Sequence, residues 1–352
     1  MKVKFGIIGY GFMGHVHVEK LLKIKEAEVV AVCDNDPAKL QDAPENIKKY
    51  SDMDELLKDE EINTVLIVVP NHIHLEAVTK AARAGKHILC EKPVAMNVKE
   101  LDEMIKVVEE CGVKFTVHHQ RRWDWDFRTA KEVYDNKSLG EVYTIQSKLF
   151  GFNGNMHDWH VYTEFGGGML FDWGVHLIDQ MLFMVDSKVK TVFADVRNVV
   201  NEEVDDYFKI LLKFENGITG EIELGTYFLA DKEQWFERHW FLGGNKGSMY
   251  CDGFAPEGKI VRTTKLLTNV PGKTTMTASG PTRSFGPPTP GLIVTEELPK
   301  VDTDQVMYYY NFIEAMKGDE EFVVKIPEVR RVLALMEAIR VSAATGKSVD
   351  FE

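Results

Sequence analysis

The sequence predicts an α/β fold, with a parallel sheet in its first 120 residues and an α+β domain on a second sheet in the rest. Apolar strand-like runs alternate with helical patterns up to about residue 120, which is typical of a parallel sheet covered by helices on both faces. Beyond residue 121 the strand-like runs follow one another closely. A length of 352 residues also favours two domains. We therefore predict domains at 1–120 and 121–352.

The N-terminal elements are expected in regular order, as a doubly wound parallel sheet. One helix should follow the first strand to about Lys25, and another should cover 74–85 and close on Gly85. A third should begin at Asn97, with Glu100 in the capping-box position, and stop at Gly112. The predicted strands, apolar enough to be buried on both faces, are 3–9, 28–34, 63–69, 87–93 and 114–119.

The C-terminal part reads as a large sheet closed by helices. No proline occurs between Pro93 and Pro256, as a hydrogen-bonded sheet prefers. Seven of the 12 prolines lie from Pro256 to Pro299, so an extended loop or flap is expected around 271–291. Helical patterns near 304–317 and 327–345 follow, and these final helices can pack back on the first domain. The predicted strands are 141–150, 191–200, 206–214, 218–228 and 235–243.

Charge and composition exclude several classes of function. The net charge is −13 and no basic tract is present, which argues against nucleic-acid and membrane partners. The four cysteines show no metal-ligand spacing, so we expect reduced thiols and no metal. The chain begins with a strand instead of a signal segment, and it has no uncharged apolar run of about 18 residues. A cytoplasmic location is therefore expected.

A glycine-rich turn predicts a dinucleotide site. GYGFMG (9–14) follows a strand and opens a helix. Gly9 permits the tight turn, Gly11 lets the backbone approach a pyrophosphate, and Gly14 lets helix and strand pack closely. Asp34 ends the second strand, 20 residues after Gly14, where a carboxylate accepts from ribose hydroxyls. Since no basic residue neutralises it in VCDNDP, we predict a Rossmann domain that prefers NAD to NADP.

An apolar helical segment carries an unexpected polar stripe. In GGGMLFDWGVHLIDQMLFMV (166–185), Asp172, His176 and Asp179 have the spacing i, i+4, i+7 and would share one helix face. His176 suits general-base work near neutral pH, and Asp172 can orient it or bind a hydroxyl. Asp179 is expected to make a structural hydrogen bond. A lone buried histidine is more often a core residue, so the pairing carries the functional interpretation.

Lys92 is a further candidate. It lies in CEKPV (90–94) at the carboxyl end of a predicted parallel strand, the edge where open α/β sheets bind ligands. Pairing with Glu91, or a solvated turn, would explain it without function. Beside a nicotinamide, however, its ammonium can stabilise an alkoxide as hydride leaves.

Together, GYGFMG with Asp34, the Glu91-Lys92-Pro93 turn and the G-G-G…D-x-G-x-H-x-x-D helix resemble the glucose–fructose oxidoreductase / inositol dehydrogenase / rhizopine catabolism (Gfo/Idh/MocA) family. The resemblance covers essentially the whole chain. It implies an N-terminal Rossmann domain and a C-terminal α+β domain with a large open, mainly antiparallel sheet. It also implies a site between the two domains, formed by Lys92, Asp172 and His176. Two departures concern His160, where many members have arginine, and Gln120, which replaces an asparagine near the nicotinamide.

The resemblance extends the set of candidate residues. The expected substrate contacts are Lys92, Arg122, Trp123, His160, Asp172 and His176, with Lys92, Asp172 and His176 catalytic. The expected NAD contacts are Gly9, Gly11, Phe12, Met13, Gly14, Asp34, Pro70, Asn71, His74, Glu91, Lys92 and Gln120.

The function expected from these residues is reversible, NAD-dependent oxidation of a secondary alcohol on a sugar, cyclitol or glycoside. Whether Lys92 or His176 is the base stays open. One alternative is a glycosidase that retains NAD and acts by transient oxidation and elimination. Another is a non-catalytic dinucleotide sensor, which would not need Lys92 with Asp172 and His176. A sheet with one uncovered apolar face predicts a homodimer or homotetramer.

Overall fold

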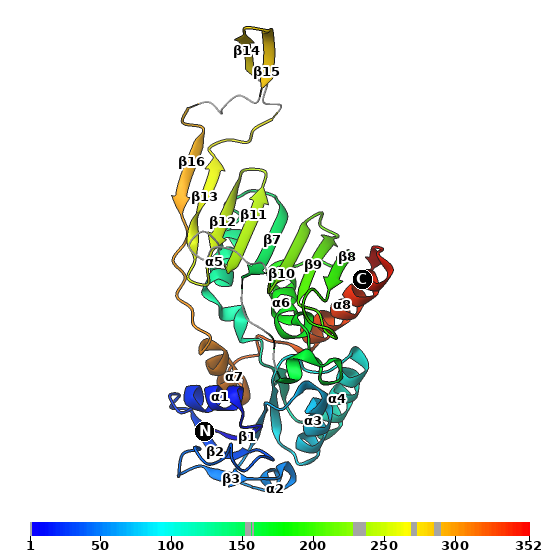
Figure 1. Ribbon diagram of the computed structural model, residues 1–352. Coiled ribbons are helices and arrows are strands. Elements are labelled where there is room, and N and C mark those ends of the chain that lie inside the picture. The colour runs from blue at the N-terminus through cyan, green and yellow to red at the C-terminus, as the bar shows by residue number, and fades with distance from the viewer. Residues whose placement is uncertain (1, 152–155, 157, 228–236, 269–272, 285–289) are drawn as a thin grey trace.

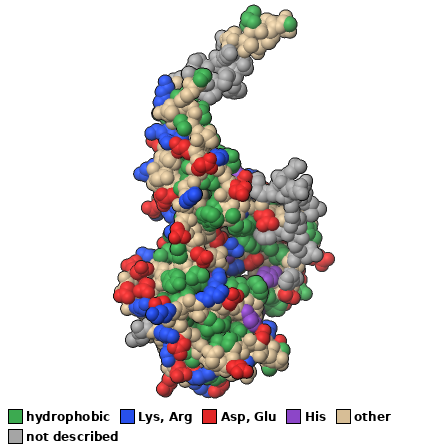
Figure 2. Space-filling view, turned by 90° about the vertical axis from the view of Figure 1, so that its left-hand side faces the viewer, with side chains coloured by type: hydrophobic (Ala, Val, Ile, Leu, Met, Phe, Trp, Pro, Cys, Tyr) green, Lys and Arg blue, Asp and Glu red, His purple; other side chains and the backbone are tan. Residues whose placement is uncertain are grey.

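The computed structural model shows two sheets, one above the other, joined by helices that contact both (Figure 1). It describes residues 2–151, 156, 158–227, 237–268, 273–284 and 290–352. None of the helices described there combines the length and apolar composition needed to span a bilayer. Acidic and basic side chains are interspersed over the face seen in Figure 2, and no broad basic patch covers it.

The lower sheet is parallel throughout and has the strand order β3-β2-β1-β4-β5-β6, the order of a dinucleotide-binding Rossmann fold. Asn97 caps helix α4 and Gly112 ends it with φ 64°, as predicted. The strands are β1 (Val3–Ile8), β2 (Ala27–Cys33), β3 (Lys48–Tyr50), β4 (Thr64–Ile67), β5 (His87–Cys90) and β6 (Phe115–Val117), and the helices are α1 (Phe12–Leu21), α2 (Met53–Leu57), α3 (His74–Arg83) and α4 (Val98–Cys111).

Two elements of the N-terminal domain, one strand and one helix, were not predicted. β3 has only three residues, Lys-Lys-Tyr, and lies at the edge, so it lacks the apolar run that marks a central strand. α2 is a single short helix of five residues whose cap is the Asp52 side chain. α1 also ends at Leu21, earlier than the expected Lys25. Short edge elements depend on tertiary contacts more than on periodicity.

The upper sheet has nine strands in the order β16-β13-β12-β11-β7-β10-β9-β8-β17. Its neighbours are antiparallel except for β7 and β10, which are parallel. The predicted large, mainly antiparallel sheet is therefore confirmed. The strands are β7 (Val142–Phe150), β8 (Val189–Arg197), β9 (Tyr207–Phe214), β10 (Thr219–Gly225), β11 (Arg238–Gly244), β12 (Gly247–Asp252), β13 (Glu257–Thr263), β16 (Ile293–Glu297) and β17 (Val349–Asp350).

The region predicted as a flap contains regular structure. A hairpin of β14 (Lys273–Thr277) and β15 (Gly280–Ser284) projects away from the body (Figure 1), and β16 returns to pair with β13 at the sheet edge. Of the predicted 271–291 segment, residues 271, 272 and 285–289 lie outside the described residues. The prolines therefore do not prevent strand pairing, because the hairpin and the sheet edge leave one side of each strand unpaired.

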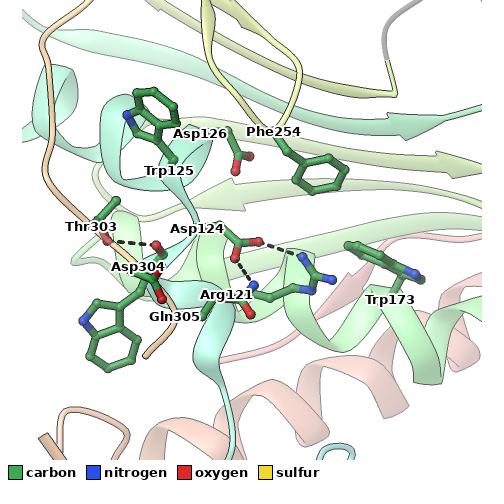
Figure 3. A pocket seen from close by; sticks show the side chains of 10 residues that line it. Arg121, Asp124, Trp125, Asp126, Trp173, Phe254, Thr303, Asp304 and Gln305 are labelled. Carbon is green, nitrogen blue, oxygen red and sulfur yellow. Dashed lines mark hydrogen bonds and ion pairs between the residues drawn. The ribbon is translucent and has the colours of Figure 1, made fainter. Parts of the chain in front are cut away.

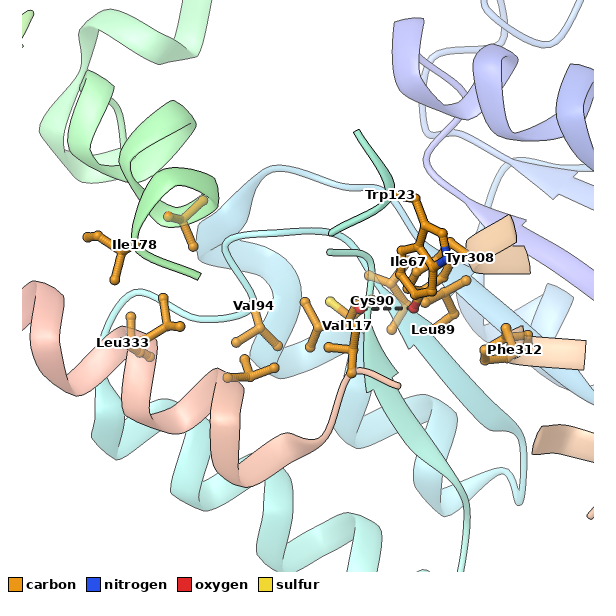
Figure 4. Close-up of a cluster of buried hydrophobic side chains, with 14 of the residues drawn as sticks. Ile67, Leu89, Cys90, Val94, Val117, Trp123, Ile178, Tyr308, Phe312 and Leu333 are labelled. Atoms are coloured by element: carbon orange, nitrogen blue, oxygen red, sulfur yellow. Dashed lines mark hydrogen bonds between the residues drawn. The ribbon is translucent and has the colours of Figure 1, made fainter. Parts of the chain in front are cut away.

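The C-terminal helices tie the two sheets into one core. These are α7 (Met307–Lys317) and α8 (Ile326–Thr345); α5 (Trp125–Asp135) and α6 (Val175–Met184) lie between upper sheet and cleft. The ring of Phe312 in α7 packs at a tilt against that of Phe5, with centroids 5.8 Å apart, and Tyr308 donates to the Val117 carbonyl at 2.8 Å. Figure 4 shows the core running from β4 and β5 past Val117 to α6 and α8. The last helices do pack back on the first domain.

The outer face of the upper sheet carries both apolar and charged side chains. Tyr143, 59% exposed, and Phe193 lie on it. Between them runs a charged ladder in which Lys148 and Lys209 both contact Glu221 and Glu223. The face is therefore less apolar than the sequence suggested. A homo-oligomer stays a prediction: light scattering at micromolar concentration should give at least twice the monomer mass, and a monomer would contradict it.

Candidate functional site

A cavity of about 700 Å³ lies where the carboxyl ends of the parallel strands meet the upper domain. This is the edge at which open α/β sheets bind ligands, and the volume is that of a cofactor-sized site. The cavity brings together thirteen of the residues predicted from sequence: Gly9, Gly11, Phe12, Met13, Asp34, Pro70, Asn71, Glu91, Lys92, Gln120, His160, Asp172 and His176. The glycine loop at 9–14 and the polar stripe at 172–176 therefore line one cavity, although they are far apart in the chain.

The glycine loop has the shape that the dinucleotide motif requires. Gly9 has φ +100°, and a Cβ there would lie 2.4 Å from the Val68 carbonyl oxygen. A Cβ on Gly14 would lie 2.4 Å from the Gly9 oxygen, so only glycine lets α1 start this close to β1. At Gly11 a Cβ would meet nothing, which leaves its backbone open to the cavity. The N-terminus of α1 therefore faces the space where a pyrophosphate would bind.

Asp34 is held at the tip of β2. Its Oδ2 accepts from Tyr10 N at 2.9 Å and its Oδ1 from Asp36 N at 3.0 Å, so the carboxylate orientation is fixed. Lys39 lies 3.5 Å from Oδ1 and also lines the cavity. The expectation that no basic residue neighbours Asp34 is thus corrected: the lysine is five positions further on and returns through the turn after β2.

Lys92 is paired with Asp172 across the cleft. Its Nζ lies 2.7 Å from Asp172 Oδ1 and donates to the Asp172 main-chain oxygen at 2.9 Å. Burial alone would raise the pKa of Asp172, but Lys92 outweighs it and the pKa is lowered, which keeps the pair ionised. Asp172 therefore positions Lys92. The sequence had instead suggested that Asp172 pairs with His176.

The helix that carries the stripe is not a regular α-helix. Leu170–Gly174 forms a π-turn that leads into α6 at Val175. π-turns of this kind are frequent at functional sites. Asp172 lies inside the π-turn and bonds Lys92, whereas His176 lies in the regular helix that follows. The sequence spacing of i, i+4 could not reveal this change of period.

His176 is a buried neutral imidazole with spare hydrogen-bonding capacity. Its Nδ1 is buried and has no hydrogen-bond partner among the described residues. Burial, reinforced by the positive charges of Lys92 and Arg121, lowers its pKa well below 6.5. A buried polar atom without a partner calls for an explanation, and the residue that carries it lines the cavity.

Glu91 anchors the lysine turn from behind. Its Oε1 accepts from His17 Nε2 at 2.9 Å and from His118 Nδ1 at 2.6 Å, while Tyr309 OH lies 2.7 Å from His17 Nδ1. These three ligand-type groups are close enough to hold a metal ion. However, hydrogen bonds already satisfy these contacts, and burial lowers the pKa of His118 to about 4. We therefore interpret the cluster as a support for Lys92, whose backbone N donates to Glu91 Oε2 at 3.0 Å.

Four predicted residues do not line the cavity. Gly14 and His74 shape it from outside: His74 is fully buried and bonds the carbonyls of Val69 and Pro93 at 2.9 and 3.0 Å. Arg122 is buried in a two-pronged ion pair with Asp179, at 2.6 and 2.8 Å. The expected substrate contact of Arg122 is thus corrected, because its donors are used inside the fold. Trp123 borders a neighbouring cavity instead.

Sequence reasoning missed several residues of the lining. Arg121 and Trp173 adjoin residues that were singled out, and the guanidinium lies 3.9 Å from the Trp173 ring centroid. Trp159 stacks on His160 with centroids 3.8 Å apart. Arg121 and Trp173 could have been proposed as lining residues, because each is adjacent in sequence to a predicted site residue. No sequence pattern indicated Lys39, because only the turn after β2 brings it back to Asp34.

The site fits a bound NAD on its own geometry. The open backbone at Gly11, the fixed carboxylate of Asp34 and the cavity volume suit the dinucleotide. At the other end, the buried Gln120 Oε1 has no hydrogen-bond partner among the described residues, so it can accept from a ligand. The residues that would hold NAD therefore line the same cavity as Lys92 and His176.

Acid should weaken folding, because several histidines are buried in the neutral state. Burial lowers the pKa of His74, His118, His119 and His176 in the folded protein. Below the unfolded value of about 6.5, the unfolded chain binds more protons, so stability falls with pH. One pH unit below it, a histidine whose folded pKa is much lower, such as His118 at about 4, should cost about 1.4 kcal/mol. We expect a lower urea midpoint at pH 5.5 than at pH 7.5, at matched ionic strength; an equal or higher midpoint would contradict this account.

Fold and site together define a dinucleotide-dependent oxidoreductase, and the comparisons with known proteins agree. Residues 3–119 match the model of the oxidoreductase family with an NAD-binding Rossmann fold, and residues 127–250 match the Gfo/Idh/MocA C-terminal domain. The chain belongs to the Gfo/Idh/MocA family, and its cofactor is NAD.

Relatives of known name are similar over most of their length. A crystal structure of an NAD-binding protein from Listeria innocua is 35% identical, with a TM-score of 0.87, covering 100% of this chain and 97% of that one. Myo-inositol 2-dehydrogenase of Thermotoga maritima is 28% identical over 278 residues, 77% of this chain and 79% of the relative. The NADP-dependent scyllo-inositol 2-dehydrogenase of Bacillus subtilis is 25% identical over 99% of this chain and 96% of its own.

Proposed function

We propose that this protein oxidises a secondary alcohol of a sugar, cyclitol or related polyol, reversibly and with NAD. The observation that carries the proposal is that His176, a buried histidine whose Nδ1 has no partner among the described residues, lines the same cavity as the Lys92–Asp172 pair and the dinucleotide loop. A non-catalytic sensor would not need this combination. The inositol dehydrogenases among its relatives support the substrate class.

The chain's own residues divide the chemistry between them. His176 is neutral at pH 7 because its pKa is lowered, so it can accept the proton of a substrate hydroxyl. Asp172 holds the Lys92 side chain in position, so its Nζ is placed to hydrogen-bond the same oxygen and stabilise the developing alkoxide. We therefore propose His176 as the base and Lys92 as the electrostatic partner. When bound, NAD supplies the hydride acceptor.

The direct test is a panel of cyclic polyols with NAD, followed by NADH absorbance. The expected result is turnover of at least one sugar or cyclitol by wild type, and turnover slower by about two to four orders of magnitude with His176→Asn at the same concentration. A second arm without added NAD separates net oxidation from the glycosidase alternative, in which glycoside would be consumed without NADH release. If no member of the panel is turned over by folded, NAD-binding protein, the sensor interpretation replaces this one.

Cofactor choice gives a separate prediction. The carboxylate of Asp34 should repel a 2′-phosphate. Lys39 should reduce this repulsion only in part, because its ammonium is already paired with Asp34. We expect kcat/KM for NAD to exceed that for NADP by about tenfold or more. Lys39→Ala should widen the ratio and Asp34→Ala should narrow it. A wild-type preference for NADP would contradict the assignment.

A further inference from the structure

A second cavity of about 440 Å³ adjoins the proposed active site (Figure 3). It is lined by Arg121, Trp123, Asp124, Trp125, Asp126, Trp173, Phe254, Thr303, Asp304 and Gln305. Its volume lies within the range of small-molecule sites. These residues come from the 3₁₀ turn Gln120–Trp123 and the start of α5 that follows it, from the π-turn, and from two loops far apart in the chain, 253–256 and 298–306. None of them belongs to the NAD-binding loop.

The two cavities share a wall. Arg121 and Trp173 line both, and they stack on each other at 3.9 Å. Trp173 follows Asp172 directly, and its ring centroid lies 6.0 Å from that of His176. Arg121 is fixed on the other side by Asp124, at 2.8 Å. A group attached to a ring beside His176 would therefore pass over this stack into the second cavity.

The lining matches a polyol ring in its chemistry. Trp125 is 46% exposed, and together with Phe254 and Trp173 it presents aromatic surface on which the apolar C–H face of a sugar can lie. Polar atoms of Asp124, Gln305 and Thr303 lie at the rim, joined by hydrogen bonds such as Gln305 Nε2 to Asp124 Oδ1 at 2.6 Å. Such side chains can exchange hydrogen bonds with hydroxyl groups.

The charges argue against an anionic ligand. Among the described residues, Arg121 is the only cation of the lining, which also includes the carboxylates of Asp124, Asp126 and Asp304. Its charge is already paired with Asp124. Asp126 is paired with the fully buried Arg238 behind the wall, at 2.9 Å. A phosphate, a nucleotide or a uronic acid bound in this cavity would therefore find no unpaired positive charge to neutralise it.

We propose that this cavity is a second subsite, which binds a neutral sugar or polyol ring linked to the ring that is oxidised. The substrate is accordingly a glycoside or disaccharide with a neutral second unit, larger than a single cyclitol. The inference rests on the proposed function for the position of the reacting ring, and it adds the size and charge of the substrate.

The test compares one-ring and two-ring substrates on the NAD-bound enzyme. For wild type, kcat/KM for the best neutral disaccharide or glycoside should exceed that of its one-ring parent by about tenfold. Trp125→Ala should abolish that advantage while leaving kcat/KM of the one-ring parent within about twofold. Trp125→Phe, which keeps an aromatic face, should retain most of it. Tyr143→Ala, which removes an exposed aromatic ring far from the cleft, is the matched control and should change neither value.

Calorimetric titration of NAD-saturated protein supplies a readout that does not need turnover. Neutral disaccharide should bind about tenfold more weakly to Trp125→Ala than to wild type. A disaccharide ending in glucuronic acid should bind wild type more weakly than its neutral counterpart. If one-ring polyols are turned over but Trp125→Ala leaves the two-ring advantage and affinity unchanged, the subsite is overturned while the proposed function stands. Tighter binding of the acidic disaccharide would also overturn it. If the disaccharide binds in a Trp125-dependent manner but is never turned over, the subsite is supported and only the proposed oxidation is contradicted.

Discussion

His176→Asn should reduce kcat by about two to four orders of magnitude while the protein still folds and binds NAD. Asparagine keeps a polar side chain of similar volume but removes the titratable nitrogen that accepts the hydroxyl proton. NAD affinity should barely change, because the residues that fit the dinucleotide lie mainly on the first domain. The measurements are steady-state kinetics on the true substrate and NAD titration by protein fluorescence.

His119→Asn is the matched control for that experiment. His119 is equally buried, with its ring centroid 6.1 Å from that of His176, but it does not line the cavity. Its replacement should cost about 1–2 kcal/mol of stability and leave kcat per folded molecule nearly intact. If His176→Asn behaves like His119→Asn, the histidine of the stripe is a core residue and the base lies elsewhere.

Lys92→Ala should also lower kcat strongly, by about two to four orders of magnitude, because it removes the positive charge that stabilises the alkoxide. It also leaves the carboxylate of Asp172 without its partner at 2.7 Å, so some stability should be lost. Lys86→Ala is the control: Lys86 is buried too, but it donates to the carbonyls of Asp59 and Ile62, far from the cleft. It should lose stability without losing turnover.

The double variant separates joint from independent action. Since Lys92 and His176 are proposed to act on one substrate oxygen, the combined loss in kcat should be smaller than the sum of the two losses in log units. A fully additive loss would mean that the two side chains act at different steps or on different atoms. Full activity of Lys92→Ala on the true substrate would remove the lysine from the mechanism.

Much of the fold could be predicted from sequence because most of its helices and strands have a local sequence pattern that identifies them. Central strands such as Ile88–Cys90 are continuous apolar runs, and α4 carries its own cap at Asn97 and its own stop at Gly112. β3, α2 and the β14–β15 hairpin escaped because short or exposed elements have no periodicity strong enough to detect. The π-turn at 170–174 escaped for another reason: it changes the period inside a helix without a sequence signal that we can identify.

Local sequence patterns were enough to propose which residues take part in the chemistry. The glycine spacing, Asp34, Lys92 and the polar stripe are chemical types at spacings that a dinucleotide fold and a base require, so they can be read along one chain. Only the tertiary structure decided what each contacts. It assigned Asp172 to Lys92, placed Lys39 beside Asp34 and withdrew Arg122 into an ion pair with Asp179. It also placed Arg121 and Trp173 between two cavities. Pairings between residues distant in the chain depend on how the two sheets are packed together, and no local pattern records that packing.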